Sequence, residues 1–555
     1  MKSCQLNVAG MQLNSDNHLS MSTFVYKLKS GFRSKMTSAP FVLAFILAAG
    51  ALIRIAWLDG RGLWYDELYT VWASKLGIRS VISEAAASGH PPLYYLLGHF
   101  WFAVASGDVG VRMLSWAAGV ATIGIVYLAG KELFDSGTGM WAAALAAFSP
   151  VLVWYSRQGT SYSWLVFLSV AFLWLLVRSA KRGGLFSWCG YMLTGAAVCL
   201  TYYLGPILIV AGWPLYWLVR ERSSKRGGRW WLTGQAGLIA VALAISLTGR
   251  AKLARHWLVF SWPHPDLIVK GLLQVTVVFT GGDWMVNDLN YGGSVLSLPG
   301  PVVFLMASAA AAAALAIVFY SRHVRHRLIG KEAAALAILA FLLLIGPIIA
   351  DVAMGRPLAA RFYLWAAPPL LVLAGAALDA ARRRSAALAG MTLLAVLLGL
   401  TAIELKFDDN RVGNWRALMA TVSHNRGQND LLYCFPLHEC AVAASFYLSK
   451  PMPLTGGFPA TDTDSIFFAA KGVPWDGYRS GYFTGSGLQL FSTSQANKRI
   501  NEDVSGFNRV WLVDSDNSDG SSPATAERLQ ALEINWRLVD KWDFPGDMLF
   551  LFVRK

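Results

Sequence analysis

Residues 40–58 read PFVLAFILAAGALIRIAWL, and residues 299–320 read PGPVVFLMASAAAAAALAIVFY. Each run approaches the roughly 20 apolar residues with which a helix crosses the hydrocarbon core of a bilayer. Of the 555 residues in the chain, 55% are hydrophobic and 15% are charged, whereas soluble domains carry about 25% charged residues. The sequence therefore predicts a polytopic α-helical membrane protein.

From the apolar runs along the whole chain, we expect about eleven transmembrane segments. Peptide groups in lipid must be hydrogen-bonded within the segment, so each span is expected to be a helix. Residues 91–106 are also apolar enough to cross, but a span there would move every later basic loop to the opposite side. We interpret that segment as an interfacial or partly inserted helix. The expected spans are 40–58, 111–130, 139–156, 162–178, 187–202, 204–220, 230–248, 299–320, 333–350, 361–378 and 386–402.

Basic residues gather in the short loops on one side of these spans. Because lysine and arginine are enriched in cytoplasmic loops, this side is expected to be the cytoplasmic face of a bacterial inner membrane. The opposite, external face then holds residues 59–110, the turn at 157–161, the long loop at 249–298 and everything after 402. The cytoplasmic groups are Lys27, Lys29, Arg33 and Lys35; Arg178, Lys181 and Arg182; Arg220, Arg222, Lys225, Arg226 and Arg229; Arg322, Arg325, Arg327 and Lys331; and Arg382, Arg383 and Arg384.

The charge is divided unevenly between the membrane part and the C-terminal part. The chain has a net charge of +15, of which residues 1–402 carry +18 and residues 403–555 carry −3. A basic excess can indicate nucleic-acid binding, but here it lies in short loops between apolar runs and is explained by membrane orientation. We therefore predict no nucleic-acid partner.

Three regions follow from this pattern: a disordered cytoplasmic tail at 1–39, a transmembrane catalytic domain at 40–402, and an extracytoplasmic soluble α/β domain at 403–555. Alternation of strand-like and helix-like runs in the last region indicates the α/β class. The strand-like runs are 431–435, 509–513, 536–542 and 548–553, and the helix-like run is 523–533. Cys434 and Cys440 lie in this region, either as a disulfide or as two thiols.

Four groups of polar and aromatic residues fall on the predicted outer face, where two adjacent carboxylates close to a bilayer indicate a functional site. Each group has an alternative role as ordinary loop or interface residues, but their order and shared side favour chemistry. They are Leu63-Trp64-Tyr65-Asp66-Glu67-Leu68-Tyr69, His90-Pro91-Pro92-Leu93-Tyr94-Tyr95, Tyr155-Ser156-Arg157-Gln158-Gly159-Thr160-Ser161-Tyr162 and Arg356-Pro357-Leu358-Ala359-Ala360-Arg361-Phe362-Tyr363.

Through these motifs the sequence resembles the GT-C membrane glycosyltransferases over about 40–410. The types it is similar to are the protein O-mannosyltransferases, the lipid A aminoarabinose transferase, and bacterial lipopolysaccharide and cell-wall sugar transferases. The resemblance implies a polyprenyl-phosphate sugar donor, an active site at the outer membrane surface and Asp66 as the catalytic carboxylate. A carboxylate can accept the proton of an attacking hydroxyl, which accelerates a reaction by about 10²–10⁴-fold.

Other residues receive roles beside Asp66. Glu67 is expected to orient Asp66, to help bind a divalent cation, or to face solvent. No cofactor is certain, and Mg²⁺ or Mn²⁺ held by Asp66 and Glu67 is the metal site left open. The leaving phosphate is expected to bind Arg157 and Arg361, with Arg356 as an alternative, because guanidinium forms a planar fork that matches phosphate. Each arginine could instead extend its charge to the interface.

Substrate-binding candidates are His90, Tyr94, Tyr162, Tyr202 and Tyr203. His90 could instead cap the helix that follows the two prolines. Related sequences often carry a histidine in a Thr-His-Tyr turn, where this chain has Thr201, Tyr202 and Tyr203. The loop 249–298 adds aromatics suited to sugar rings or to the membrane interface.

The leading hypothesis is a glycosyltransferase that moves a sugar from a polyprenyl-phosphate donor to an acceptor hydroxyl with inversion. The acceptor could be a glycan, a lipid or a protein. A transporter or flippase of lipid-linked sugars is the alternative, although the repeated halves typical of transporters are not evident. A membrane-anchored binding protein, in which Asp66 has no catalytic role, is the third hypothesis.

Overall fold

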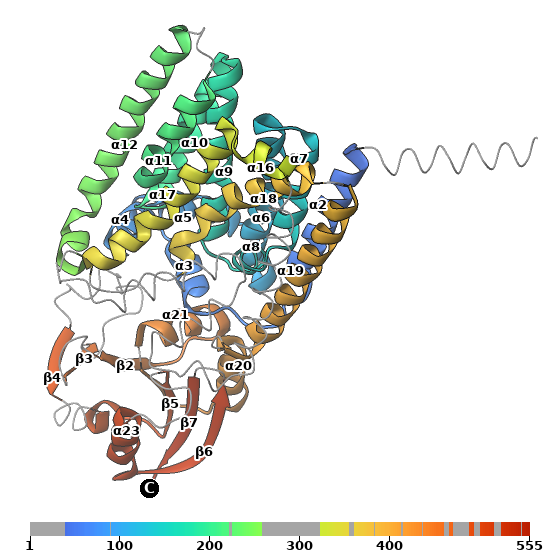
Figure 1. The fold of residues 1–555 in the computed structure, drawn as a ribbon. Helices are drawn as coiled ribbons and strands as arrows, with labels where there is room; N and C mark the ends of the chain where they lie inside the picture. The colour runs from blue at the N-terminus through green and yellow to red at the C-terminus, as the bar shows by residue number, and fades with distance from the viewer. Residues whose placement is uncertain are drawn as a thin grey trace, which may run out of the picture.

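A computed structural model shows a helical bundle joined to a sheet-containing domain (Figure 1). The predicted tail 1–39 and span 299–320 lie outside the described residues, Ala39 excepted. The structure describes residues 39–88, 90–220, 225–257, 322–354, 360–381, 383–411, 414–435, 437–459, 465–469, 488–492, 500–515, 523–544 and 547–555.

The bundle contains helices at every predicted span within the described residues. The break between α7 and α8 falls at Pro150, which lies in the first turn of α8, and the two helices meet at 60°. The elements are α2 (Ala39–Ile55), α6 (Gly107–Leu133), α7 (Ser136–Phe148), α8 (Pro150–Ser156), α9 (Tyr162–Arg182), α10 (Leu185–Thr201), α11 (Gly205–Val219), α12 (Lys225–Trp257), α16 (Arg322–Leu328), α17 (Lys331–Met354), η2 (Ala360–Ala366), α18 (Ala367–Ala380) and α19 (Arg383–Arg411).

Within the described residues, four helical segments are long and apolar enough to cross a membrane, or five if α7 and α8 form one bent span. The four segments are Gly107–Leu133, Tyr162–Arg182, Lys331–Ile349 and Arg361–Ala380. Shorter apolar helices cover further predicted spans, among them α2, α10 and α11. The total of eleven spans stays a prediction.

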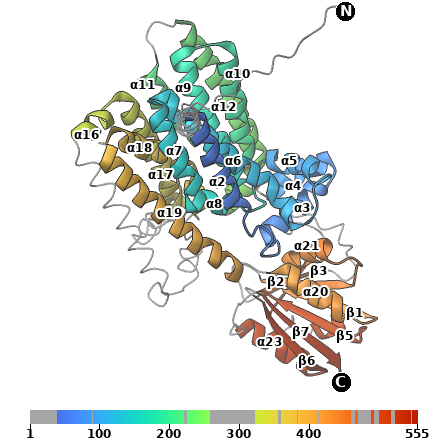
Figure 2. The ribbon, with the colours of Figure 1, turned by 90° about the vertical axis from the view of Figure 1, so that its right-hand side faces the viewer.

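The segment 59–110, which the sequence predicts to be external, forms three short helices, α3 (Tyr65–Lys75), α4 (Ile78–Ser88) and α5 (Leu93–Trp101). Figure 2 shows them beside the bundle and next to the C-terminal domain. Helix α5 has nine residues, whereas a span needs about 20. Residues 91–106 therefore do not form a membrane-crossing helix, as the loop charges predicted.

The C-terminal domain is built on a seven-stranded mixed sheet in the order β4-β3-β2-β1-β5-β7-β6. Strand β1 pairs in parallel with β2 and with β5, and the other neighbours are antiparallel. The predicted strand runs fall within β1 (Asp430–Phe435), β5 (Arg509–Asp514), β6 (Trp536–Phe544) and β7 (Asp547–Arg554), and the predicted helix is α23 (Pro523–Glu533). The sequence analysis did not predict β2 (Leu454–Pro459), β3 (Ser465–Ala469), β4 (Leu488–Ser492), α20 (Trp415–Asn425) or α21 (Leu437–Tyr447).

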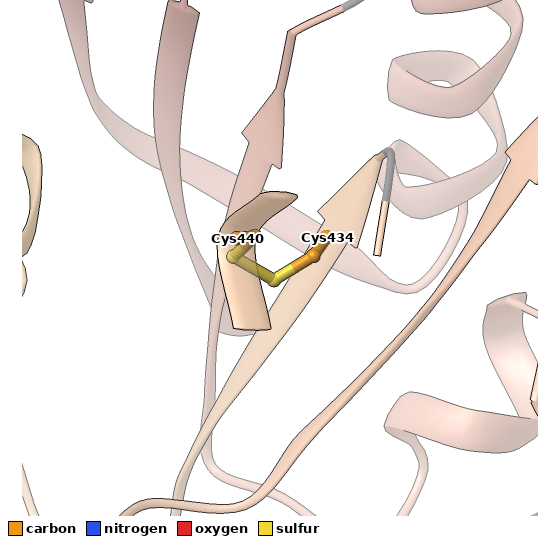
Figure 3. Close-up of a disulfide and its surroundings, with 2 residues drawn as sticks. All are labelled: Cys434 and Cys440. Carbon is orange, nitrogen blue, oxygen red and sulfur yellow. A yellow bond between two sulfur atoms is a disulfide. The ribbon is translucent and has the colours of Figure 1, made fainter. Parts of the chain in front are cut away.

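A disulfide joins Cys434 at the end of β1 to Cys440 in the second turn of α21 (Figure 3). The alternative of two free thiols is therefore wrong. Both cysteines are buried in an apolar core that also contains Leu63, Leu68 and Val71 of the segment 59–110. The C-terminal domain and the helix that carries Asp66 thus share one hydrophobic core.

Candidate active site

Helix α3 places the adjacent acids Asp66 and Glu67 in its first turn. Carboxylates are stabilised there by the helix dipole. Glu67 also accepts the backbone N–H of Trp64 at 3.2 Å, which closes the first turn. Neighbouring residues on a helix point in different directions, and these two acids have different surroundings.

Glu67 is fully buried in a network of donors. The Arg112 guanidinium forms a two-bond fork, with Nε to Oε1 and Nη2 to Oε2 both at 2.8 Å. Arg61 lies 3.4 Å from Oε2, and the Gly159 N–H donates to Oε1 at 2.8 Å. Burial would raise the pKa of Glu67, but the charges of Arg112 and Arg61 outweigh it and hold the pKa at about 2. Glu67 is therefore ionised and fixed in place.

The expectation that Glu67 could face solvent is wrong. Both of its oxygens are occupied by protein donors, so Glu67 does not fit as a ligand for a divalent cation. Among the described residues, no group of three histidine, cysteine, aspartate or glutamate side chains could hold a metal ion. Glu67 anchors the helix turn that carries both acids. That it orients Asp66 in this way stays a prediction.

Asp66 is half-buried, and its carboxylate makes no hydrogen bond to any part of the chain that the structure describes. Burial raises its pKa, and the nearby Arg361 charge opposes this only in part. A raised pKa makes a carboxylate a stronger base. Asp66 thus has the free oxygens and the basicity that Glu67 lacks.

Arg361, at the start of η2, lies close enough to Asp66 to affect its ionisation. Its guanidinium stands over the ring of Tyr162, the first residue of α9, at 5.7 Å from the centroid. Arg361 also lies close enough to Tyr202 to interact with it electrostatically. The structure thus brings together four residues that the sequence predicted: Asp66, Tyr162, Tyr202 and Arg361.

Tyr202 lies in the turn between α10 and α11, where its ring contacts Phe362 and Trp365, each at 5.6 Å between centroids. Its hydroxyl is buried and has no hydrogen-bond partner in the described part of the chain. A buried hydroxyl without a partner is costly and is typical of a position that a ligand completes. Tyr203 is half-buried, and burial raises its pKa.

Two predicted residues have structural roles. Arg157 donates from Nη1 and Nη2 to carbonyl oxygens at the end of α2, including that of Trp57 at 3.2 Å. Its guanidinium holds that helix end, and its contact with the donor phosphate stays a prediction. Tyr94 is buried, and its hydroxyl contacts that of Ser115 at 2.9 Å. It ties α5 to α6, and its contact with a substrate stays a prediction as well.

His90 is exposed, and its ring meets the edge of the Tyr95 ring at 6.2 Å between centroids. It does not cap α5, because that helix begins at Leu93 after Pro92. Because His90 is exposed, its contact with a substrate stays a prediction. Arg356 and residues 258–298 of the long loop lie outside the described residues.

A second group of residues, formed by Tyr69, Glu84 and Tyr95, lies near Asp66 and was not predicted from the sequence. Tyr69 donates its hydroxyl to the buried Glu84 at 2.9 Å, and the ring of Tyr95 packs edge-on against Tyr69 at 6.3 Å between centroids. Burial raises the pKa of Tyr95, and the charge of Asp66 raises it further. Tyr65, Tyr69 and Trp72 recur every three or four residues, and this spacing on one helix face could have revealed the group.

Residues 89–247 match the family model described as dolichyl-phosphate-mannose-protein mannosyltransferase. The match starts just before the HPPLYY motif and ends within α12. This match agrees with the resemblance of the sequence to the GT-C glycosyltransferases.

Among solved structures, the chain is similar to ArnT from Cupriavidus metallidurans in the apo state, with a TM-score of 0.57 and 12% identity over 92% of this chain and 97% of that one. ArnT bound to undecaprenyl phosphate gives a TM-score of 0.54 at 12% identity, over 93% and 98%. The oligosaccharyltransferase of Archaeoglobus fulgidus gives 0.46 at 15% identity, over 90% and 71%. No curated protein matches the sequence. At 12% identity, the likeness to the two ArnT structures establishes the fold alone.

Proposed function

We propose that this protein is a glycosyltransferase that transfers a sugar from a polyprenyl-phosphate donor to an acceptor hydroxyl. The observation that carries this proposal is the grouping of Asp66, Tyr162, Tyr202 and Arg361. Arg361 stands over the Tyr162 ring, the Tyr202 ring packs against Phe362, and Arg361 is close enough to Asp66 to affect its ionisation. One site then holds a base for the acceptor and a cation for the departing phosphate. The fold shared with ArnT, which has been crystallised with undecaprenyl phosphate, supports this class of donor.

In this mechanism the acceptor oxygen attacks the anomeric carbon while its proton passes to Asp66. The bond between that carbon and the phosphate oxygen breaks, and the phosphate leaves with the bonding electron pair. Arg361 stabilises the charge that develops on the phosphate, an effect that is often the largest single contribution to catalysis. One displacement inverts the anomeric centre. The Tyr202 hydroxyl is free to bind a sugar hydroxyl.

We also propose that the reaction occurs on the extracytoplasmic side of a bacterial inner membrane. The one-sided distribution of basic loops supports this orientation. The Cys434–Cys440 disulfide supports it independently, because disulfides persist in oxidising compartments such as the periplasm. The acceptor, whether a glycan, a lipid or a protein, would approach from that compartment.

The proposal is tested by incubating the purified full chain with a panel of polyprenyl-phosphate sugars and candidate acceptors. Transfer releases polyprenyl phosphate, whereas flipping of a lipid-linked sugar leaves the donor intact. We expect Asp66→Asn to reduce release by at least about 10²-fold. Asp540→Asn, which changes an exposed acid on β6, serves as the matched control and is expected to keep full activity. Equal turnover by Asp66→Asn and the wild type would reject this mechanism.

A further inference from the structure

Tyr447, the last residue of α21, joins the C-terminal domain to the segment that leads into α3. Its hydroxyl accepts the backbone N–H of Leu63 at 2.7 Å. It also lies 3.1 Å from each carboxylate oxygen of Asp108 and donates to that group. One phenol therefore links α21, the chain just before α3, and the start of α6.

A second contact between the same parts lies at Arg416 of α20. Nη1 is 2.7 Å from Oδ1 of Asp59 and 3.3 Å from Oδ2 of Asp108, and Nη2 donates to the Asp59 carbonyl oxygen at 2.8 Å. The Asp108 carboxylate thus accepts hydrogen bonds from Tyr447 and forms an ion pair with Arg416. Because Asp108 is almost fully buried, loss of one donor would leave part of its polar surface unpaired.

The bundle holds the same stretch of chain from the opposite side through Arg112. Its guanidinium donates to the carbonyl oxygens of Leu58 at 2.7 Å and Gly62 at 2.9 Å, besides forming the fork with Glu67. Arg112 lies one helical turn after Asp108 on α6. Residues 58–63 are therefore clamped between Arg112 in the bundle and the Tyr447–Arg416 pair in the C-terminal domain.

We propose that Tyr447 is a positioning residue for Asp66, so that the C-terminal domain forms part of the catalytic architecture through its contact with α3. This inference rests on the proposed function. The hydroxyl fixes Leu63, two residues before α3, while Arg112 fixes Glu67 in its first turn. Together they set where Asp66 stands relative to Arg361. A displacement of about 1 Å at a reacting group can lower a rate by about 10²-fold.

The kinetic test compares Tyr447→Phe with the wild type in the full chain. We expect kcat to fall about tenfold or more, with the donor KM unchanged within about twofold, because Tyr447 has no contact with the Asp66–Arg361 group. Tyr191→Phe is the matched control, since it removes a buried hydroxyl that accepts a hydrogen bond from Gln235 inside the bundle. Asp108→Asn should lower kcat as well, and the double variant should lose less than the sum of both effects.

Hydrogen exchange of the α3 amides supplies a readout that does not depend on activity. We expect Tyr447→Phe to accelerate exchange across Tyr65–Lys75, whereas Tyr191→Phe leaves it unchanged. Faster exchange in a protein whose wild type shows no transfer would reject the proposed function and keep the positioning role. Unchanged exchange, or faster exchange with an unaltered kcat in an active enzyme, would overturn the positioning role.

Discussion

Arg112 and Glu67 form a two-bond ion pair across the interior of the protein, with both N–O distances at 2.8 Å. The pair connects α6 in the bundle to the first turn of α3, next to Asp66. Because both side chains are buried, water cannot solvate either charged group if its partner is removed. This pair fixes Glu67 in place, whereas the neighbouring Asp66 takes no part in it.

We expect Arg112→Gln to lower stability by about 3–5 kcal/mol, since it leaves the Glu67 charge buried without a counter-charge. Arg112→Lys keeps the charge but loses the fork, so it should show an intermediate loss. The apparent melting temperature of the purified chain measures both effects. If Arg112→Gln had the same melting temperature as the wild type, the buried charge of Glu67 would not depend on this ion pair.

The two predicted phosphate-binding arginines should respond differently to substitution. Arg361→Gln is expected to lower kcat by about 10²–10³-fold with little change in melting temperature, because Arg361 acts on developing charge. Arg157→Gln should instead cost about 1.5–3 kcal/mol of stability through lost bonds to the end of α2. Paired kinetic and melting measurements separate the two roles. A catalytic loss with normal stability in Arg157→Gln would support its assignment to the phosphate.

The disulfide should stabilise the C-terminal domain. Closing a loop across a sequence separation of six residues is expected to contribute about 2 kcal/mol through the unfolded state. Cys440→Ser should therefore lower the melting temperature, and reductant should have the same effect on the wild type. Cys189→Ser, which changes an exposed free thiol, is the control. Identical melting of Cys440→Ser and Cys189→Ser would contradict a stabilising bridge.

Asp547, at the start of β7, should make the C-terminal domain less stable as pH rises. Burial raises its pKa from 3.8 to about 7, an effect that Ser515 reduces only in part. Between these values the folded carboxyl keeps a proton that the unfolded chain has lost, so the free energy of unfolding falls through this window and levels off above it. The change amounts to about 4 kcal/mol at most.

Exchange protection of the β7 amides, corrected for the intrinsic effect of pH on exchange, measures this dependence. Asp547→Asn should flatten the profile between about pH 4 and about pH 7. Asp543→Asn, which changes an exposed acid on β6, should keep the slope of the wild type. A slope that survives in Asp547→Asn would assign the effect to another group.

Much of the fold follows from local sequence. Apolar runs of bilayer length predict helices because lipid offers the backbone no other hydrogen-bond partner, and the structure has helices at those runs that lie within its described residues. Strand runs such as 431–435 and 509–513 were visible because they are short and apolar. Strands β2 to β4 were not predicted, since pairing with neighbours rather than local propensity determines where such strands form.

The sequence by itself determined the membrane class, the motifs and the presence of Asp66, Tyr162, Tyr202 and Arg361 among the candidates, because residue type and apolar length are local properties. Only the tertiary structure decided which acid is paired with Arg112 and which arginine lies close enough to Asp66 to affect its ionisation. Glu67 and Asp66 are adjacent and similar in chemistry, and they differ because Arg112, 45 residues away, folds onto one of them. Contacts between distant segments set burial and charge, and these in turn set what each side chain can do.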